Sequence, residues 1–259
     1  MHCFTFDIET VPDVASGRQL FDLDGLSDED VATAMTFKRL QAVGHDFLPL
    51  HLHRVVAISA TFRTGNSFRV WSLGEESSDE PELVQRFFDG VEKYTPDLVS
   101  WNGGGFDLPV LHYRALKHGI RAPRYWEHGD SDRDFKWNNY LSRYHWRHVD
   151  LMDVLANFNN RAFAKLDEIA VMLGFPGKLG MSGAKVWDRF REGKIAEIRN
   201  YCETDVLNTW LVYLRFEYMR GGLDDVDLQR EYALVRDTLT KMECAHLDEF
   251  LAAWKSQES

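Results

Sequence analysis

The segment FTFDIET, residues 4–10, ends a strand suited to a protein interior with two carboxylates. Apolar and β-branched residues dominate residues 2–8, a pattern that predicts a buried strand. Residues two apart in a strand point to the same face, so Asp7 and Glu9 stand side by side. Burial and mutual repulsion both penalise charges placed in this way. A divalent cation such as Mg²⁺ or Mn²⁺ removes both penalties, whereas a strand end in solvent avoids them.

The rest of the pattern predicts one α/β domain with a mixed sheet. Residues 11–50 are a polar, acidic insertion or flap with one helical patch at residues 31–43. Further strands are expected at residues 54–62, 68–71 and 97–101. Helices are expected at residues 81–94, 106–118, 149–158, 164–173, 184–191, 195–220 and 225–254, with irregular structure at 120–147. We place the main domain at residues 1–222 and a C-terminal helical extension at 223–259.

A third carboxylate follows the predicted buried strand at residues 97–101, in the segment WNGGGFD. Asp107 begins the next helix, at the kind of strand end where ligands of α/β sheets gather. The three glycines at residues 103–105 permit a close approach of the backbone to another group. The alternative is that Asp107 only satisfies free amides at the start of the helix.

A fourth carboxylate lies in YCETD, inside the long predicted helix at residues 195–220. The spacing of four residues places Tyr201 and Asp205 on one face of that helix. Apolar neighbours indicate that this part of the helix is packed inside, where an unpaired Asp205 would be costly. The alternatives are that Asp205 faces solvent and that Tyr201 is a core aromatic with a hydrated hydroxyl.

In this order, FDIET, WNGGGFD and YCETD resemble the three motifs of the DEDD superfamily of 3′–5′ exonucleases. Tyr201, four residues before Asp205, matches the tyrosine-bearing subgroup. Residues 4–214 resemble the bacterial predicted exonuclease family that is related to the proofreading domain of family B DNA polymerases. The segments VDLMDVL and IRNYCETDVLNTWLVYLRF are also similar to that family. The resemblance implies a ribonuclease H-like fold, with a mixed β-sheet flanked by helices and C-terminal helices on a single domain.

The resemblance also implies a metal-dependent exonuclease that releases nucleoside monophosphates from single-stranded nucleic acid, DNA more than RNA. Two Mg²⁺ or Mn²⁺ ions would stabilise the attacking and the leaving oxygens. Asp7 would bridge both ions, and Glu9 and Asp205 would complete the shell of the first. Asp107 would hold the second ion through water, and Tyr201 would orient the attacking water.

The net charge of −11 argues against a protein that coats nucleic acid non-specifically. It agrees with an enzyme whose positive charge at the phosphate comes from metal ions. Carboxylates worth about −4 and two divalent ions worth about +4 leave the site neutral only when metal is bound. The implied partner is therefore a nucleic acid with a free 3′ end.

Several further expectations concern the setting of the protein. The apolar runs are too short for a membrane segment, and the N-terminus lacks the features of a signal peptide. Cys3, Cys202 and Cys244 show no CxxC spacing, which favours core positions in a reducing cytoplasm. At 259 residues we expect no attached polymerase domain, so the chain is a stand-alone nuclease or acts beside a polymerase or repair partner. The oligomeric state stays open.

Thr10, Asn102, Phe106 and Lys185 are candidates for substrate contact, because they lie in or near the motifs. The basic residues Arg114, Lys117, His118, Arg121 and Arg124 either track phosphates or form a solvated face. Residues 135–148 interleave bases and aromatics, which suits base stacking but also a buried helix face. The residues of that face would be Trp137, Tyr140, Leu141 and Tyr144.

Three further groups of side chains have expected roles. Lys178, like Lys185, could reach a phosphate from the loop before the last motif. Asp150 is expected to support the site by hydrogen bonding. His45, His51 and His53 lack the spacing of zinc motifs and are expected to be structural.

The main alternative function is a non-catalytic nucleic-acid-binding module on the same fold. Such a module has no need of four converging carboxylates, which repel phosphate in the absence of metal. A dinucleotide-binding oxidoreductase does not fit, because WNGGG is not a G-x-G-x-x-G segment after the first strand. An endonuclease of the same fold is less well matched by the spacing of Tyr201 and Asp205.

Overall fold

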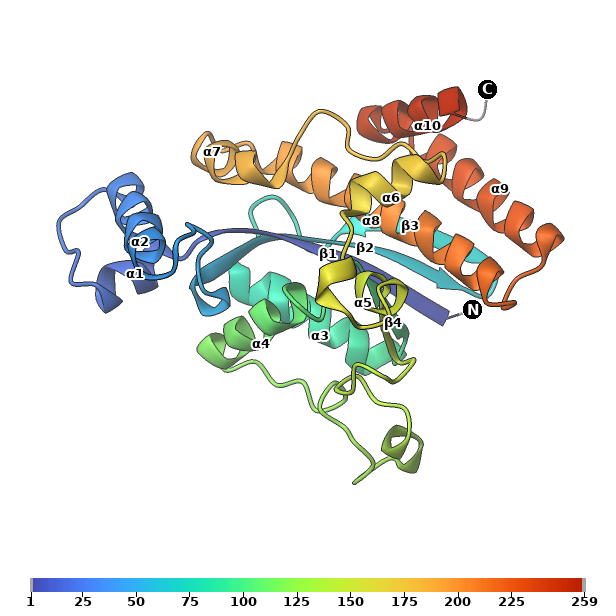
Figure 1. The fold of residues 1–259 in the computed structure, drawn as a ribbon, viewed down its shortest axis with the longest axis horizontal. Coiled ribbons are helices and arrows are strands. Elements are labelled where there is room, and N and C mark those ends of the chain that lie inside the picture. Colours follow the sequence, from blue (N-terminus) through green and yellow to red (C-terminus); the bar gives the residue numbers. More distant parts are fainter. Residues whose placement is uncertain (1, 258–259) are drawn as a thin grey trace.

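The computed structural model describes residues 2–257, and these form one five-stranded sheet flanked by helices (Figure 1). The strands are β1 (His2–Pro12), β2 (His53–Thr64), β3 (Ser67–Ser72), β4 (Asp97–Ser100) and β5 (His148–Asp150). The first helices are α1 (Val14–Leu20), α2 (Asp28–Val43), α3 (Glu80–Tyr94), α4 (Asp107–His118) and α5 (Leu151–Leu155). The later helices are α6 (Leu166–Met172), α7 (Val186–Arg191), α8 (Ile195–Met219), α9 (Asp225–Met242) and α10 (Ala245–Gln257). Short 3₁₀ helices lie at Leu50–Leu52, Arg133–Lys136, Asn160–Ala162 and Gly183–Lys185.

The sheet has the strand order β3-β2-β1-β4-β5, with β1 in the centre. β1 runs antiparallel to β2 and parallel to β4, and β4 runs parallel to β5. The predicted α/β class, with a mixed sheet flanked by helices, is confirmed. The short strand β5, which pairs with β4, follows a long irregular segment. The sequence pattern did not predict this strand.

The alternation of side chains along β1 divides the core into two layers. Phe4, Phe6 and Ile8 pack in one cluster with residues of α3 and α4. Cys3, on the opposite face, packs in a second cluster with residues of α8, α9 and α10. Figure 1 shows α3 and α4 on one side of the sheet and α8 to α10 on the other. Asp7 and Glu9 have the parity of Cys3, so they face α8.

Helix α8 is the spine of the second layer and lies across β1 and β2. Its middle part is buried on nearly every side: Val206, Leu207, Trp210 and Leu211 are all fully buried. This explains why its sequence is apolar on more than one face, as expected for a helix inside a domain rather than on its surface. The same turns of α8 carry Tyr201 and Asp205.

The segment 11–50 is more ordered than predicted. β1 continues to Pro12, and α1 precedes α2, where only one helical patch was expected. Val31, Met35, Leu48 and Leu52 form a small core of their own within this segment. In Figure 1 the segment projects from the sheet at the end of β1 opposite the N-terminus. We call residues 13–52 the helical lobe.

The prediction of a single helix at residues 225–254 is wrong, because the helical structure is interrupted between α9 and α10. Glu243 adopts a left-handed conformation with φ of 52°, which ends α9. Leu239, Leu247 and Phe250 are nevertheless fully buried in one cluster with residues of α8. A buried ion pair from Arg63 to Glu231, 2.6 Å long, joins β2 to α9. The boundary at residue 222 stays a prediction, and residues 258 and 259 of the proposed extension lie outside the described part.

Arg114 corrects the view of a basic surface on α4. Its side chain is 2% exposed and pairs with Asp13 Oδ2 at 2.6 Å and with Glu80 Oε2 at 2.5 Å. Lys117 also pairs with Asp13, at 2.7 Å, and His118 contacts Glu80. Arg114 therefore ties α4 to the end of β1 and to the start of α3, and it neither tracks phosphates nor lies on a solvated face. Alternation and helical spacing did not reveal this because its acidic partners are remote in the sequence.

The aromatic and basic segment 135–148 is not a helix face. Phe135 and Tyr140 are 1% and 2% exposed, and the Tyr140 hydroxyl donates to Pro96 O at 2.6 Å. Trp137 and Tyr144, by contrast, are 78% and 67% exposed. The predicted buried helix face is wrong for these two rings and for Leu141, which is 42% exposed, because this segment has only one short 3₁₀ turn.

Within residues 2–257, no helix is both long enough and apolar enough to cross a membrane.

Candidate active site

Asp7 and Glu9 lie side by side on the face of β1 that packs under α8. Glu9 is 8% exposed, and Asp7 is partly buried. Burial raises the pKa of Asp7 well above its ordinary value, and the charges of Asp107, Glu9 and Asp205 raise it further. Burial also raises the pKa of Glu9, together with the charges of Asp205 and Asp107. The carboxylates from three remote segments therefore lie close enough for their charges to interact, as the sequence predicted.

Asp107 begins α4 and reaches back to the central strand. Its Oδ1 accepts a hydrogen bond from the Ile8 amide at 3.1 Å, which places this carboxylate between Asp7 and Glu9 along the backbone of β1. The side chain is 3% exposed, and burial raises its pKa to about 7, although hydrogen bonds from amides act in the opposite direction. Asp107 thus lies beside the carboxylates of β1, and no side-chain hydrogen bond caps the start of α4.

The glycine loop before Asp107 packs on its own neighbours. A Cβ on Gly103 would lie 2.3 Å from Ser100 Oγ, and one on Gly105 would lie 2.4 Å from Asn102 Oδ1. Asp150, at the end of β5, accepts hydrogen bonds from the amides of Asn102 at 2.8 Å and Gly104 at 2.9 Å. The close approach inferred from the glycines is therefore made to protein groups, and Asp150 gives the expected hydrogen-bonding support.

Tyr201 and Asp205 lie one turn apart on α8, and both are buried, at 6% and 9% exposure. Burial raises the pKa of Asp205 to about 6, although a hydrogen bond with Tyr201 and the charge of Lys178 act to lower it. Burial and the charges of Asp205 and Glu9 raise the pKa of the Tyr201 phenol far above its ordinary value. The phenol therefore stays protonated at neutral pH and is a hydrogen-bond donor. Asp205 does not face solvent.

Cys202 is the site neighbour that sequence reasoning missed. Its thiol donates to Asp7 O at 3.4 Å and to Asp7 Oδ2 at 3.5 Å. Among the described residues, a donor atom of Cys202 lies within 4.8 Å of donor atoms of Asp7 and Glu9. Burial and the adjacent carboxylates raise the pKa of this thiol, so it remains a neutral donor to Asp7. Its position one residue after Tyr201, on the same turn of α8, was the available signal. Cys3 is also buried, as predicted, whereas Cys244 is only partly so.

Lys178 brings a positive charge to the carboxylates. Its charge lowers the pKa of both Glu9 and Asp205, and its Nζ lies 6.0 Å from the centre of the Tyr201 ring. The backbone amide of Lys178 donates to Asp167 Oδ1 at 2.7 Å, which anchors the loop between α6 and α7. The side chain itself is exposed, so it can meet an anionic ligand at this edge of the site.

The donor set fits hard divalent cations. Asp7, Glu9, Asp107 and Asp205 offer carboxylate oxygens, which Mg²⁺ and Mn²⁺ prefer, and their mutual repulsion is the feature that a cation would relieve. Asp7 and Glu9 belong to a tight group whose ligand atoms all lie within 4.8 Å of one another, and Asp107 and Asp205 are not members of it. Cys202 completes that tight group, but a neutral thiol is a poor ligand for a hard cation.

The four candidates for substrate contact are placed differently around the carboxylates. The Thr10 hydroxyl hydrogen-bonds His53 Nδ1 at 2.9 Å, and the Phe106 ring packs against the His53 ring with centroids 5.2 Å apart. Asn102 has a left-handed backbone, with φ of 63°, and its carbonyl accepts from the amides of Gly105 and Phe106. Asn102 thus shapes the loop. Lys185 is exposed and lines a cavity together with Tyr201.

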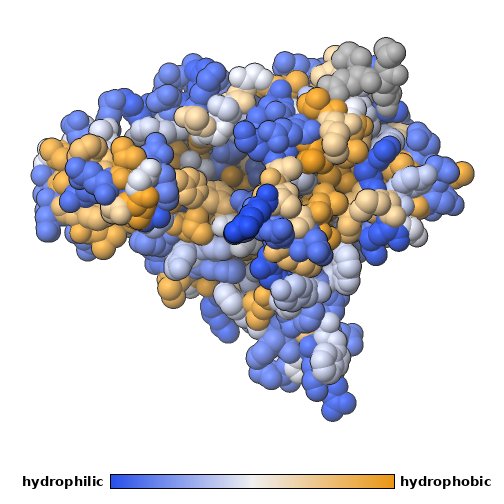
Figure 2. Space-filling view, viewed as in Figure 1, coloured by the Kyte–Doolittle hydropathy of each residue, from blue (hydrophilic) through white to orange (hydrophobic). Residues whose placement is uncertain are grey.

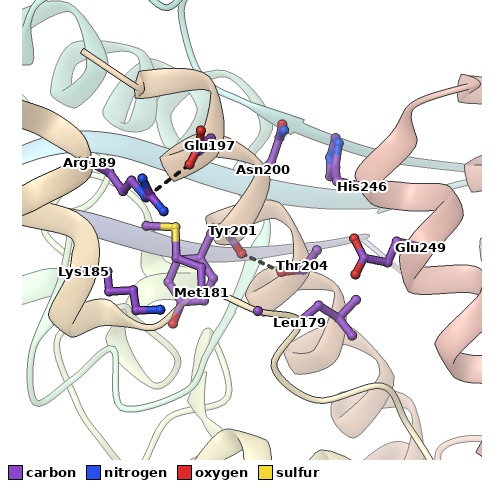
Figure 3. Close-up of a pocket in the computed structure, with 11 residues that line it drawn as sticks. Leu179, Met181, Lys185, Arg189, Glu197, Asn200, Tyr201, Thr204, His246 and Glu249 are labelled. Atoms are coloured by element: carbon purple, nitrogen blue, oxygen red, sulfur yellow. Dashed lines mark hydrogen bonds and ion pairs between the residues drawn. The ribbon is translucent and has the colours of Figure 1, made fainter. Parts of the chain in front are cut away.

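That cavity has a volume of about 270 Å³ and lies between the loop after α6, α8 and α10 (Figure 3). Tyr201 and Lys185 line it, and His246 and Glu249 of α10 close its opposite side. None of the four carboxylates lines this cavity. Arg189, which also lines it, is paired with Glu197 at 3.2 Å, as the dashed line in Figure 3 shows. The C-terminal helix α10 therefore lines the same cavity as Tyr201.

Comparisons with known proteins agree with this geometry. Residues 45–254, well over half of the chain, match the family described as a predicted 3′–5′ exonuclease related to the exonuclease domain of PolB. A DNA polymerase of Thermococcus litoralis is 29% identical over 153 residues, which are 56% of this chain and 9% of the polymerase. DNA polymerase 1 of Sulfurisphaera ohwakuensis is 46% identical over 43 residues, 17% of this chain and 5% of that polymerase. The chain thus spans only a small part of the length of these relatives.

Solved structures are also similar, and one of them is a polymerase. The family B DNA polymerase from the hyperthermophilic archaeon Pyrobaculum calidifontis covers 81% of this chain at 19% identity and a TM-score of 0.49. The match takes up 24% of that polymerase chain. The matched family segment continues to residue 254, so it crosses the boundary predicted at residue 222 and includes α9 and most of α10.

Proposed function

Since the chain belongs to the family of predicted 3′–5′ exonucleases related to the exonuclease domain of PolB, we propose that it removes nucleotides from the 3′ end of single-stranded nucleic acid with divalent metal ions. We propose DNA in preference to RNA, nucleoside monophosphates as products, and a ribonuclease H-like fold of the tyrosine-bearing DEDD subgroup. The observation that carries the proposal is the convergence of Asp7, Glu9, Asp107 and Asp205 between β1 and α8, where each is buried or partly buried and burial raises the pKa of all four.

Two Mg²⁺ or Mn²⁺ ions, held by these four carboxylates, would supply the positive charge that activates water and stabilises the leaving oxygen. The protein's own contribution begins with rigidity. Asp7 and Glu9 are fixed by β1, Asp205 by the buried middle of α8, and Asp107 by its hydrogen bond from the Ile8 amide. Groups held in this way need no reorganisation during the reaction.

Tyr201 and Lys178 carry the remaining roles that we propose. The Tyr201 phenol, protonated at neutral pH, donates a hydrogen bond on the side of Asp205, where it can orient an attacking water. The exposed ammonium of Lys178 offsets the carboxylate charge and can meet the scissile phosphate. The alternative of a non-catalytic binding module does not explain why four carboxylates are buried together.

Digestion of strands labelled at the 5′ end tests the proposal. With Mg²⁺ or Mn²⁺, single-stranded DNA should yield a ladder that shortens from the 3′ end, and EDTA should abolish it. RNA of the same sequence and a blunt duplex complete the panel. Asp205→Ala is the control for a contaminating nuclease, since it removes one proposed metal ligand. Uncut strands with either metal, or cutting that survives Asp205→Ala, would overturn the proposal.

Tyr201→Phe should lower kcat by about ten- to hundredfold with little change in KM, because it removes the hydrogen bond between the Tyr201 hydroxyl and the Asp205 carboxylate. The loss of that bond should also raise the pKa of Asp205, which moves the acidic limb of the pH–rate profile to higher pH. Tyr213→Phe is a matched control, since Tyr213 is buried on the same helix and its hydroxyl contacts Cys3 instead. Equal effects of the two substitutions on the pH profile would show that Tyr201 is only a core ring.

A further inference from the structure

Phe47, in the helical lobe, is an exposed aromatic ring with an unusual setting. It is 52% exposed, yet its ring lies against two others, with centroids 5.1 Å from His53 and 5.9 Å from Phe106. An apolar ring that stays in water while resting on other rings has one free face. In Figure 2, hydrophobic side chains gather over the lobe on the left of the molecule.

The backbone around Phe47 is fixed from two directions. Arg39 of α2 donates from Nε to Phe47 O at 3.1 Å. His53 Nε2 donates to Leu48 O at 3.2 Å, because a carbonyl can only accept, and His53 Nδ1 therefore accepts from the Thr10 hydroxyl. Burial lowers the pKa of His53, which keeps this arrangement neutral. The ring is consequently presented by a rigid loop, as preorganised binding surfaces require.

These contacts connect Phe47 directly to the carboxylates. Thr10 follows Glu9 on β1, and Phe106 precedes Asp107 at the start of α4. The rings of Phe47, His53 and Phe106 are therefore in contact with one another. Together they extend from the proposed ligand segments of β1 and α4 to solvent. Residues 36–47, from the C-terminal half of α2 to Phe47, carry Lys38 and Arg39 against one acid, Asp46, whereas the first turn of α2 carries three acids. The end of α2 that leads to Phe47 is thus its less acidic end, and Lys38 and Arg39 give it the charge that suits a phosphate backbone.

We propose that Phe47 is the stacking platform for an unpaired base near the 3′ end of the strand in the active site, with Arg39 as the residue that positions it. The proposal rests on the proposed function and specifies its substrate. A base inside a duplex has both faces covered by its neighbours, so a ring that stacks on one requires an unpaired strand. Aromatic rings beside basic groups bind single strands in this way, with little dependence on sequence.

The lobe contains a closely matched control. Phe37 of α2 is 56% exposed, the same residue type in the same lobe. It lies two residues from Arg39, which turns it about 200° around the helix, away from the side that holds Phe47. No ring contact of Phe37 with His53 or Phe106 exists among the described residues.

The test measures binding and stacking separately from cleavage. Oligonucleotides with phosphorothioate linkages at the 3′ end and one 2-aminopurine, placed in turn at each of the last four positions, are titrated with protein in Ca²⁺. Deoxyribose and ribose strands, and a blunt duplex, are compared. Stacking on Phe47 should quench the 2-aminopurine at one position. Phe47→Ala should abolish that quenching and weaken single-strand binding about tenfold, while Phe37→Ala should stay within about twofold.

Phe47→Trp should restore both binding and quenching, since a larger ring stacks at least as well. Unchanged quenching in Phe47→Ala, or equal losses in the two alanine variants, would overturn the inference while the wild-type ladder still supports the exonuclease. A change of oligomeric state in Phe47→Ala, without a change in quenching, would assign the ring to a protein interface and also overturn it. If the wild type neither binds nor cuts any strand, the proposed function itself fails.

Discussion

Asp7→Asn should unfold at a higher temperature than the wild type in EDTA, and it should lose on the order of a thousandfold or more in kcat with Mg²⁺. The two effects have one origin. Asp7 is held among Asp107, Glu9 and Asp205, and burial and these charges all disfavour its ionised form. Without metal, a neutral side chain of the same shape relieves the repulsion, which should contribute about 1 to 3 kcal/mol. With metal, the same change removes a proposed ligand.

The control for Asp7→Asn is Asp130→Asn, which removes one negative charge at an exposed position. The Asp130 side chain is 83% exposed, and its contact is with His128 at 3.7 Å. This variant should keep both its activity and its melting temperature. Thermal melts in EDTA and in Mg²⁺, beside single-turnover rates, give both readouts. A lower melting temperature of Asp7→Asn in EDTA would show that the carboxylate stabilises the metal-free fold, contrary to the repulsion described here.

The stability of the wild type relative to Asp107→Asn should fall by about 4 kcal/mol between pH 4 and pH 8 in EDTA. Burial raises the pKa of Asp107 from 3.8 to about 7, so the folded protein retains a proton that the unfolded chain releases. That stabilising contribution is complete below about pH 4 and is lost as the pH rises through about 7. Asparagine cannot titrate and keeps an oxygen to accept from the Ile8 amide, so it represents the neutral acid at every pH.

The difference between the two proteins is required because other groups titrate in the same range. Burial lowers the pKa of His112 and of His148 to about 4, so their contribution to stability grows as the pH rises from 4 to 6.5. These opposing contributions cancel when Asp107→Asn is subtracted. Urea unfolding at pH 4, 6 and 8 measures the difference. A constant difference across these values would mean that Asp107 is ionised throughout and compensated by another group.

The sheet and the carboxylates could be predicted because each depends on a local pattern. Alternation along β1 put Asp7 and Glu9 on one face, and helical spacing put Tyr201 beside Asp205. Arg114 and Cys202 could not be assigned in this way. The ion pairs of Arg114 join residues 34 and 101 positions away, and Cys202 meets Asp7 across 195 positions. Such contacts are set by tertiary packing, which a run of neighbouring residues does not encode.

The break between α9 and α10 and the extent of the helical lobe were missed for a related reason. Periodicity continues through Glu243, whose left-handed backbone is a single-residue event that an apolar pattern cannot reveal. The lobe is polar overall, and its core of Val31, Met35, Leu48 and Leu52 is too small to produce a strong period. Both features became visible only where side chains remote in sequence met.

Helix α8 has a consequence for the way in which this protein would fail. The turns that bury Trp210 and Leu211 also carry the aspartate and the tyrosine to which we assign the chemistry. The core residues and the proposed site residues lie on the same continuous helix. A substitution that disturbs the packing of this helix should therefore also displace Asp205, a proposed metal ligand. Heat should then abolish the proposed hydrolysis and unfold the protein in the same step, so the rate of hydrolysis would report how much of the protein is correctly folded.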